Sequence, residues 1–288
     1  LNGSIDEVMM FDRALSAVEI GALYNAGSTQ YYRNFTLGRG LHDYTAYAID
    51  AAGNMNETEN WNFTQENLAP ATTTPVLNAT TTENTTGDNL TLHYTLSDAN
   101  DDPVTGIVDW RLDGASIAVL NLPFDTNTTS NETRAVRDYT TYQNNATLGN
   151  GDVTKVPAYV DGMVGGAYNL TNYTYIRVPA SASLQKSDNI TVMAWAKPTR
   201  LDNWNVIISK YEYGEDNRSW ELSIDPTTGE VYVTISTEAQ SMTTVYTDGN
   251  VSEGEWVHAA FTFAGGDLKI YLNGTLDKSQ TLSQKSMD

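Results

Sequence analysis

The chain has 288 residues, no cysteine and a formal net charge of −20, with 16 Lys and Arg against 36 Asp and Glu. The length suits about two or three domains. The missing cysteines exclude disulfide scaffolds, cysteine-ligated zinc and thiol catalysis. The acidic excess would repel nucleic acid. The histidines are too scattered to build a His-rich metal cluster; they are His42, His93 and His258.

Residues 1–27 predict a strand ending in a turn, followed by one short helix. The helix is indicated by a capping box at Ser16 and Glu19 and by a glycine C-cap at Gly27. Between them lies an apolar stripe at helical spacing, formed by Ile20, Leu23 and Tyr24. This is the helix that we expect near the N-terminus.

The rest of the chain reads as short strands rich in Val, Ile, Thr, Tyr and Trp, separated by Gly, Asn and Asp. The turns "DPTTGE" (residues 225–230) and "AGGD" (residues 264–267) each predict a hairpin. The fold class is therefore an all-β sandwich. The clearest predicted strands are residues 89–97, 190–197, 206–210, 219–224, 231–237, 257–263 and 268–272.

Two stretches resemble the laminin-G-like branch of the concanavalin A-like lectin and glucanase superfamily. The N-terminal "NGSIDEVMMFDRALSAVEIGALYNAG" resembles the last strand and closing helix of that jelly-roll sandwich. The C-terminal part resembles the rest of the domain, from "LNLPFD" through "ITVMAWAKP" to "WVHAAFTFAGGDLKIYLNG". The resemblance implies one jelly-roll domain split between the two ends of the chain.

The middle of the chain resembles immunoglobulin-like modules of microbial surface proteins. "YTAYAIDAAGNMNETENWNF" is similar to a final hairpin, and "NLTLHYTLSDANDDPVTGIVDWRLDG" is similar to early strands, with Trp110 as the core tryptophan. We therefore divide the chain into four segments. They are residues 1–27 (closing strand and helix), 28–68 (immunoglobulin-like C-terminal hairpin), 69–118 (immunoglobulin-like N-terminal strands) and 119–288 (laminin-G-like domain lacking its last strand).

A jelly roll without its last strand would expose an apolar face and an unpaired sheet edge. The closing element could come from the same chain, from the next repeat of a longer tandem chain, or from a neighbouring subunit. The last two alternatives predict copies of the chain joined head to tail in an open filament. Fewer residues separate "YLNG" from the end of the chain than family members usually carry before the closing strand.

Asparagine is abundant, and 16 of the 26 asparagines begin an N-x-S/T sequence, where random placement would give about five. Each is an acceptor for N-glycosylation. This excess predicts a heavily glycosylated extracellular protein, and dense acceptors without cysteine favour an archaeal surface protein. The acceptors are Asn2, Asn34, Asn56, Asn62, Asn78, Asn84, Asn89, Asn127, Asn131, Asn145, Asn169, Asn172, Asn189, Asn217, Asn250 and Asn273.

No catalytic residues are assigned. Glycosidases need two carboxyl groups about 5–10 Å apart, whereas Glu221 and Asp225 would lie about 13 Å apart along one strand. Glu253 and Glu255 flank a glycine in a polar turn, where solvated carboxylates are expected. His258 begins a strand, where a structural role is expected. We therefore do not expect an enzyme, and no cofactor is required.

The sequence indicates two candidate ligand sites. The first comprises Asp98, Asn100 and Asp102, which place oxygen ligands at alternate positions, as half of a Ca²⁺ loop does. The alternative is that these residues form only a polar turn. The second comprises Trp204, Tyr211 and Tyr213, which lie in polar loops where aromatic rings can stack on sugars. The alternative is that they are ordinary core and edge residues of a β-sandwich.

The chain has no signal peptide and no apolar run of about 18 residues. Because of its many N-glycosylation acceptors, it is interpreted as a processed or excerpted piece of a secreted protein. The favoured function is a structural repeat of an extracellular filament or cell-surface protein, joined to copies of itself. The alternative is a carbohydrate-binding or adhesion module.

Overall fold

The computed structural model divides the chain into two compact units, Leu1–Val104 and Thr105–Asp288, which are taken separately below. The residues that the structure describes are 10, 14–17, 20, 39–83, 85–126, 136–171, 173–186, 188–202, 205–210, 219–236, 242–283 and 285–287. Of the predicted N-terminal helix, one turn is described, in which the Ile20 N–H donates to the Ser16 carbonyl. Residues 1–9, 11–13, 18–19 and 21–27 lie outside the described residues.

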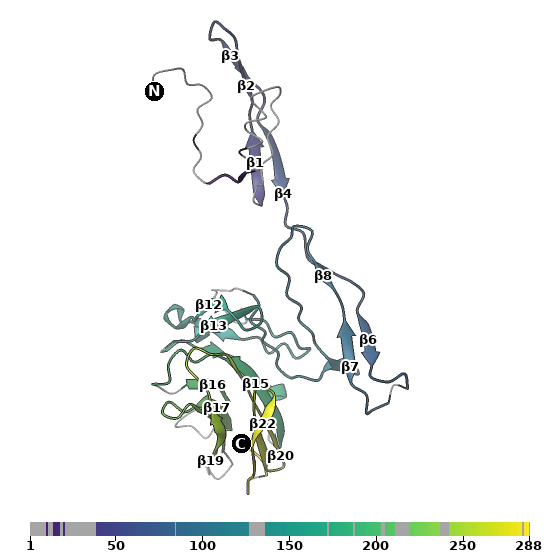
Figure 1. The fold of residues 1–288 in the computed structure, drawn as a ribbon, viewed down its shortest axis with the longest axis vertical. Helices are drawn as coiled ribbons and strands as arrows, with labels where there is room; N and C mark the ends of the chain where they lie inside the picture. The colour runs from purple at the N-terminus through teal and green to yellow at the C-terminus, as the bar shows by residue number, and fades with distance from the viewer. Residues whose placement is uncertain are drawn as a thin grey trace. The chain divides into compact units, whose positions relative to one another are not determined.

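The first unit is built from antiparallel pairs of strands (Figure 1). β1 pairs with β4, β2 with β3, β5 with β8 and β6 with β7. The bounds are β1 Gly40–Tyr44, β2 Tyr47–Ile49, β3 Met55–Glu57, β4 Trp61–Gln65, β5 Ala71–Thr72, β6 Val76–Ala79, β7 Leu90–His93 and β8 Leu96–Ser97.

The turn between β2 and β3 shows how the local sequence makes these hairpins. Asp50 Oδ1 accepts the N–H groups of Ala52 and Asn54, both at 2.9 Å. Gly53 follows with φ +86°, a left-handed conformation that glycine adopts without steric cost. Residues 50–54, "DAAGN", therefore form the turn of this hairpin.

None of the described residues from 39 to 104 is buried. Large apolar side chains such as Trp61 and Ile49 are more than half exposed. Two-stranded hairpins are marginal in water without a packed face, so these strands have no core of their own in the described part of the unit. The immunoglobulin-like sandwich expected here stays a prediction.

The second unit begins with short elements that precede its main sheets. β9 pairs with β10, β11 with β14 and β12 with β13. A small cluster of Val136, Ala146 and Leu148 lies buried among them. The bounds are β9 Arg111–Leu112, β10 Ala115–Ser116, β11 Thr147–Leu148, η1 Gly149–Gly151, η2 Val153–Lys155, β12 Ala158–Asp161, β13 Gly166–Asn169, β14 Ile176–Arg177 and η3 Ala182–Leu184.

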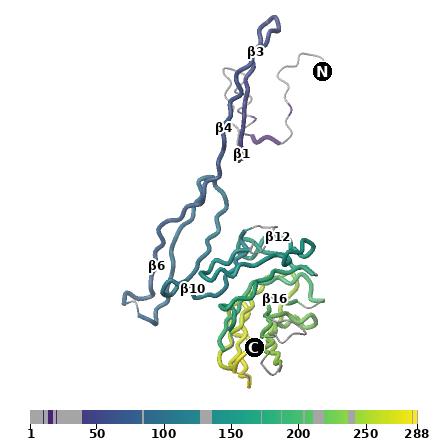
Figure 2. Tube along the Cα trace, turned by 180° about the vertical axis from the view of Figure 1, so that it is seen from behind, coloured from purple at the N-terminus to yellow at the C-terminus, as the bar shows by residue number. Residues whose placement is uncertain are grey.

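Two four-stranded antiparallel sheets follow, in the orders β15-β20-β21-β22 and β16-β17-β18-β19. They lie as two layers, seen from opposite sides in Figures 1 and 2. The bounds are β15 Asn189–Ala196, β16 Asn205–Lys210, β17 Trp220–Ile224, β18 Glu230–Ser236, β19 Met242–Asn250, β20 Val257–Ala264, β21 Asp267–Leu272 and β22 Thr275–Thr281. All the strands predicted between residues 190 and 272 are confirmed, within one residue at each end.

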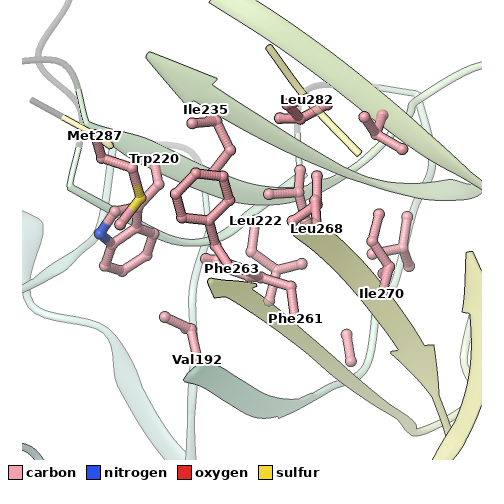
Figure 3. Close-up of a cluster of buried hydrophobic side chains, with 14 of the residues drawn as sticks. Val192, Trp220, Leu222, Ile235, Phe261, Phe263, Leu268, Ile270, Leu282 and Met287 are labelled. Carbon is pink, nitrogen blue, oxygen red and sulfur yellow. The ribbon is translucent and has the colours of Figure 1, made fainter. Parts of the chain in front are cut away.

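The core lies between the two sheets (Figure 3). Alternate side chains of each strand point inward, and Leu222, Val233, Phe261 and Ile270 are fully buried. Burying one such side chain stabilises the fold by about 1.5–3 kcal/mol. The predicted all-β sandwich is therefore confirmed in this unit.

The prediction for Trp110 is wrong. Its side chain is 39% exposed, because no second layer among the described residues covers it. The tryptophan that does pack in a core is Trp220 on β17, which is 7% exposed and meets the ring of Phe261 edge to face. An aromatic strand residue is therefore buried in a core only where a second sheet faces its own sheet.

Candidate functional site

A cavity of about 760 Å³ opens in the second unit, before the main sheets begin in the chain. Its size falls in the range of small-ligand sites. The wall is made by Arg111 of β9, by residues 124–126 and by the loop 136–145. The described side chains that carry charge there are Arg111, Asp125, Arg137 and Asp138.

Asp138 holds the loop in shape. It is 2% exposed, and its Oδ1 accepts the N–H groups of Asn121 at 2.9 Å and of Thr140 at 3.0 Å. Its Oδ2 accepts the Thr140 hydroxyl and the Asn144 N–H, both at 2.7 Å. A buried carboxylate is tolerated when it is fully hydrogen-bonded, so Asp138 builds the wall rather than serving as a free acid.

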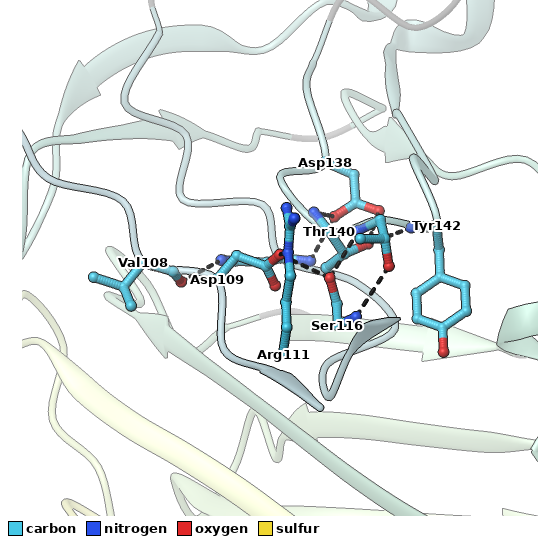
Figure 4. Close-up of polar contacts among 9 residues, drawn as sticks. Val108, Asp109, Arg111, Ser116, Asp138, Thr140 and Tyr142 are labelled. Atoms are coloured by element: carbon cyan, nitrogen blue, oxygen red, sulfur yellow. Dashed lines mark hydrogen bonds and ion pairs between the residues drawn. The ribbon is translucent and has the colours of Figure 1, made fainter. Parts of the chain in front are cut away.

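Ser116 joins the β9–β10 hairpin to this loop (Figure 4). Its N–H donates to the Thr141 hydroxyl at 3.0 Å, and the Thr141 N–H donates back to Ser116 Oγ at 2.8 Å. Ser116 Oγ in turn donates to Asp109 at 2.8 Å. The Arg111 Nε also donates to Asp109, at 2.6 Å, and this bond is the main reason why the pKa of Asp109 is lowered.

Arg137 and Tyr139 present the groups that a ligand would meet. The guanidinium carbon of Arg137 lies 5.0 Å from the centre of the Tyr139 ring, within the range of a cation–π contact. Arg137 is exposed, whereas Tyr139 is half-buried. The cavity thus combines arginine donors with an aromatic ring and with the amides of Gln143 and Asn145.

Both carboxylate oxygens of Asp138 and one of Asp125 accept structural hydrogen bonds. Both oxygens of Asp138 accept two donors each, and Asp125 Oδ1 accepts the Gly166 N–H at 3.0 Å. A general acid or base needs a carboxyl group within reach of the reacting proton. The arrangement therefore provides groups for binding polar molecules.

A second polar cluster lies on the outer face of the sheet β16–β19. Glu221 Oε1 accepts the hydroxyls of Ser223 at 2.8 Å and Tyr232 at 3.0 Å. Burial raises the pKa of the Tyr232 hydroxyl to about 12, and the adjacent Glu221 carboxylate adds to this effect. Asp225 is not part of this cluster, because its Oδ1 accepts the N–H groups of the following turn, from Thr227 and Thr228.

Asp98, Asn100 and Asp102 take part in separate contacts. Asp98 Oδ1 accepts the N–H groups of Asn100 at 2.8 Å and Asp102 at 3.3 Å, and Asn100 Oδ1 accepts the Leu68 N–H at 2.8 Å. Asp102 forms an ion pair with Arg39. No group of three or more His, Cys, Asp or Glu in the described part of the chain is placed to hold a metal ion. These side chains fit Ca²⁺ poorly as they stand, because a cation would compete with Arg39, and the calcium site stays a prediction.

The other residues singled out from the sequence are distributed along both units. Trp204, Tyr211 and Tyr213 lie outside the described residues, so the aromatic sugar site stays a prediction. His258 N–H donates to Asn273 Oδ1 at 3.0 Å, and its ring meets that of Trp195 edge to face. Glu253 Oε1 accepts the Leu201 N–H at 2.7 Å.

The cavity was not predicted from the sequence. Arg137 and Tyr139 lie in one short segment, but Arg111 and residues 124–126 come from earlier segments, so no single motif contains the whole wall. The signal that was present is the pattern Asp138-x-Thr140, in which an aspartate side chain commonly accepts the N–H two residues on. It indicates an organised loop, but not which ligand the loop would bind.

The comparisons with known proteins support the class of fold in the second unit. Residues 170–288 match the model of the Concanavalin A-like lectin/glucanases superfamily. The resemblance drawn from the C-terminal motifs is therefore confirmed. No curated protein matches the chain.

Several solved structures are similar to the chain, and these likenesses concern the fold alone. The binding domain of Paraclostridial Mosquitocidal Protein 1 is 20% identical, with a TM-score of 0.43, over 55% of this chain and 40% of that one. Domain 4 of AbnA, a GH43 extracellular arabinanase from Geobacillus stearothermophilus in complex with arabinotriose, is 22% identical, with a TM-score of 0.40, over 52% and 74%. The botulinum neurotoxin serotype G binding domain is 21% identical, with a TM-score of 0.41, over 53% and 38%.

The chain thus spans less than half of the first and third of these structures. Among the described residues, the structure contains no helix with the length and apolarity needed to cross a membrane.

Proposed function

We propose that residues 105–288 form a carbohydrate-binding module of an extracellular or cell-surface protein. The observation that carries the proposal is the cavity in which Arg137 lies over the Tyr139 ring beside a loop fixed by Asp138. Sugars present both hydroxyls and apolar C–H faces, so a site that combines hydrogen-bond donors with an aromatic ring suits them. The match of residues 170–288 to the Concanavalin A-like lectin/glucanases superfamily agrees with this role, and the cavity residues precede the matched segment in the chain.

Arg137 favours a sugar that carries a carboxylate, because it lines the cavity and its side chain is exposed. The other arginine of the wall, Arg111, is already bonded to Asp109. Arginine binds carboxylates with two parallel hydrogen bonds, and Asp138 has both oxygens occupied by the protein. Acidic oligosaccharides are therefore the ligand class that we expect.

A glycan array that contains uronic-acid and sialic-acid oligosaccharides tests the proposal, followed by calorimetric titration of the best ligand. Arg137→Ala should weaken binding at least about tenfold, because a charge-assisted hydrogen bond contributes about 1.5–3 kcal/mol. Arg200→Ala is the matched control, since Arg200 is also exposed but does not line the cavity. Equal binding by Arg137→Ala and the wild type, with both folded, would contradict the assignment.

A second function, a structural repeat that assembles with copies of itself, is favoured by the hairpins of residues 39–104. Their apolar side chains are exposed in the described part of the unit, so strands or faces from another copy would find a surface to cover. The closing segment that would complete a neighbouring jelly roll lies outside the described residues, and the head-to-tail filament remains part of this proposal.

Light scattering over a range of protein concentrations tests the assembly. The expected result is a mass that grows without a fixed stoichiometry, because head-to-tail contacts do not close. Trp61→Ser should reduce this growth, whereas Lys269→Ser, an exposed substitution in the sandwich, should leave it unchanged. A chain that stays monomeric at every concentration would rule this function out.

A further inference from the structure

The hairpins of residues 39–104 have two chemically different faces. Directly opposed residues of an antiparallel pair share a face, and neighbours along a strand alternate between faces. In the β1–β4 pair, Tyr44 lies opposite Trp61 and His42 opposite Phe63, which makes one face aromatic. The opposite face carries Asn62.

The other two hairpins repeat this division. In the β2–β3 pair, Ile49 lies opposite Met55, and Asn56 occupies the other face opposite Ala48. In the β6–β7 pair, Leu77 lies opposite Leu92, whereas Asn78 lies on the other face opposite Thr91.

Asn89 follows the same rule one position beyond β7. The Thr80 N–H donates to the Asn89 carbonyl at 3.0 Å, which continues the β6–β7 pairing by one step. Asn89 is two positions from Thr91, and Asn78 is two positions from Thr80, so both asparagines share the polar face. All the acceptor asparagines described in this unit are exposed, and each lies on the side of its hairpin that points away from the apolar face. They are Asn56, Asn62, Asn78 and Asn89.

Asn145 is a different case, although its tripeptide Asn-Ala-Thr has the same form. Its Oδ1 accepts the Asp138 N–H at 2.8 Å. The next two residues, Ala146 and Thr147, are 0% and 5% exposed, so the threonine hydroxyl that an acceptor site needs is buried. Asn145 also lines the cavity, where an attached glycan would fill the space.

We propose that N-glycans are attached selectively, to Asn56, Asn62, Asn78 and Asn89 on the polar faces of the hairpins and not to Asn145 in the cavity wall. The glycans leave the aromatic and aliphatic faces bare. The inference does not depend on whether the cavity binds a sugar.

The transfer itself needs a glycan donor activated as a phosphate or diphosphate and an oligosaccharide transferase, both supplied by the cell. The asparagine Nδ2 forms a bond to the sugar C1 while the bond from C1 to the phosphate oxygen breaks. The nitrogen loses one proton, and the phosphate leaves as the anion. This adds a bulky hydrophilic group, which fits a face exposed to water.

Glycopeptide mass spectrometry of the whole chain, purified from the cells that produce it, tests the proposal. Glycan masses are expected on the peptides that contain the four hairpin asparagines, and the Asn145 peptide is expected unmodified. Thr64→Ala should remove the glycan at Asn62, and Thr64→Ser should retain it, because serine also completes the acceptor sequence.

Unmodified asparagine at the four hairpin positions, or a modified Asn145 at similar occupancy, would overturn the proposal. Since the measurement contains no sugar ligand, it gives the same answer whether or not the proposed carbohydrate binding holds. Loss of binding in Arg137→Ala and loss of a glycan in Thr64→Ala are thus separate results.

Discussion

The two units differ in what lies opposite each apolar face. In residues 39–104, Trp61 is 58% and Phe63 46% exposed, although both alternate with polar residues as inward-facing strand residues do. In the sandwich of the second unit, Trp220 is 7% and Phe263 1% exposed. The local pattern is the same, and a second sheet is present in only one of the cases. A strand's pattern decides which face is apolar, and only packing decides whether that face is buried.

The largest expected effect comes from truncating an aromatic ring in the two regions. Phe261→Ala removes a fully buried ring between the sheets and should lower the free energy of unfolding by about 3–5 kcal/mol. Phe63→Ala removes a half-exposed ring and should lower it by less than about 1 kcal/mol. Urea denaturation followed by tryptophan fluorescence measures both. Equal losses would show that the hairpins carry a core after all.

Two aspartates with similar numbers of hydrogen bonds sharpen the comparison. Asp138→Ala leaves the buried N–H groups of Asn121, Thr140 and Asn144 without their acceptor, which should cost about 3 kcal/mol. Asp50→Ala removes the acceptor of an exposed turn, where water replaces it at a cost below about 1 kcal/mol. Thermal unfolding of the two variants compares them, and a larger loss for Asp50→Ala would contradict the burial argument.

At alkaline pH the sandwich should lose stability through Tyr232. Its folded pKa is raised to about 12 from 10.0, so the folded state favours the protonated phenol. This contribution is fully present below about pH 10 and is lost as the pH rises toward 12. Thermal unfolding across that window should show a falling midpoint. Tyr232→Phe should flatten the fall, and an unchanged slope in this variant would exclude Tyr232 as its source.

The smallest effect is expected at acid pH in the β2–β3 turn. Hydrogen bonds from the side chain and the N–H of Asn54 lower the pKa of Asp50 below its usual value of 3.8. The stability that these bonds give the turn is present above the unfolded pKa and is lost as the pH falls through the folded one. Amide chemical shifts of Gly53 and Asn54 should therefore titrate with a midpoint below pH 3.8, and a midpoint above that pH would refute the turn geometry.

How much the sequence could predict depended on how local each signal was. The strands of residues 190–272 were predictable because their apolar runs are bounded by turn signals such as Gly265 and Gly266, both at positive φ. The burial of Trp110 was wrongly predicted, since burial depends on a distant second layer. The cavity was not predictable, because Arg111 and the segment of Arg137 and Tyr139 come together only through bonds such as those of Ser116 with Thr141 and of Asp138 with Asn121.

Native-state hydrogen exchange on the monomeric chain at low concentration tests the central claim most directly. Amides of β17, β18 and β20, which lie in the sandwich, should exchange only through global unfolding and be strongly protected. Amides of β1, β4, β6 and β7 should exchange orders of magnitude faster, because their hairpins open locally without disturbing a core. Protection in β1, β4, β6 and β7 as strong as that in the sandwich would contradict the account, since it would mean that residues 39–104 have a buried core of their own.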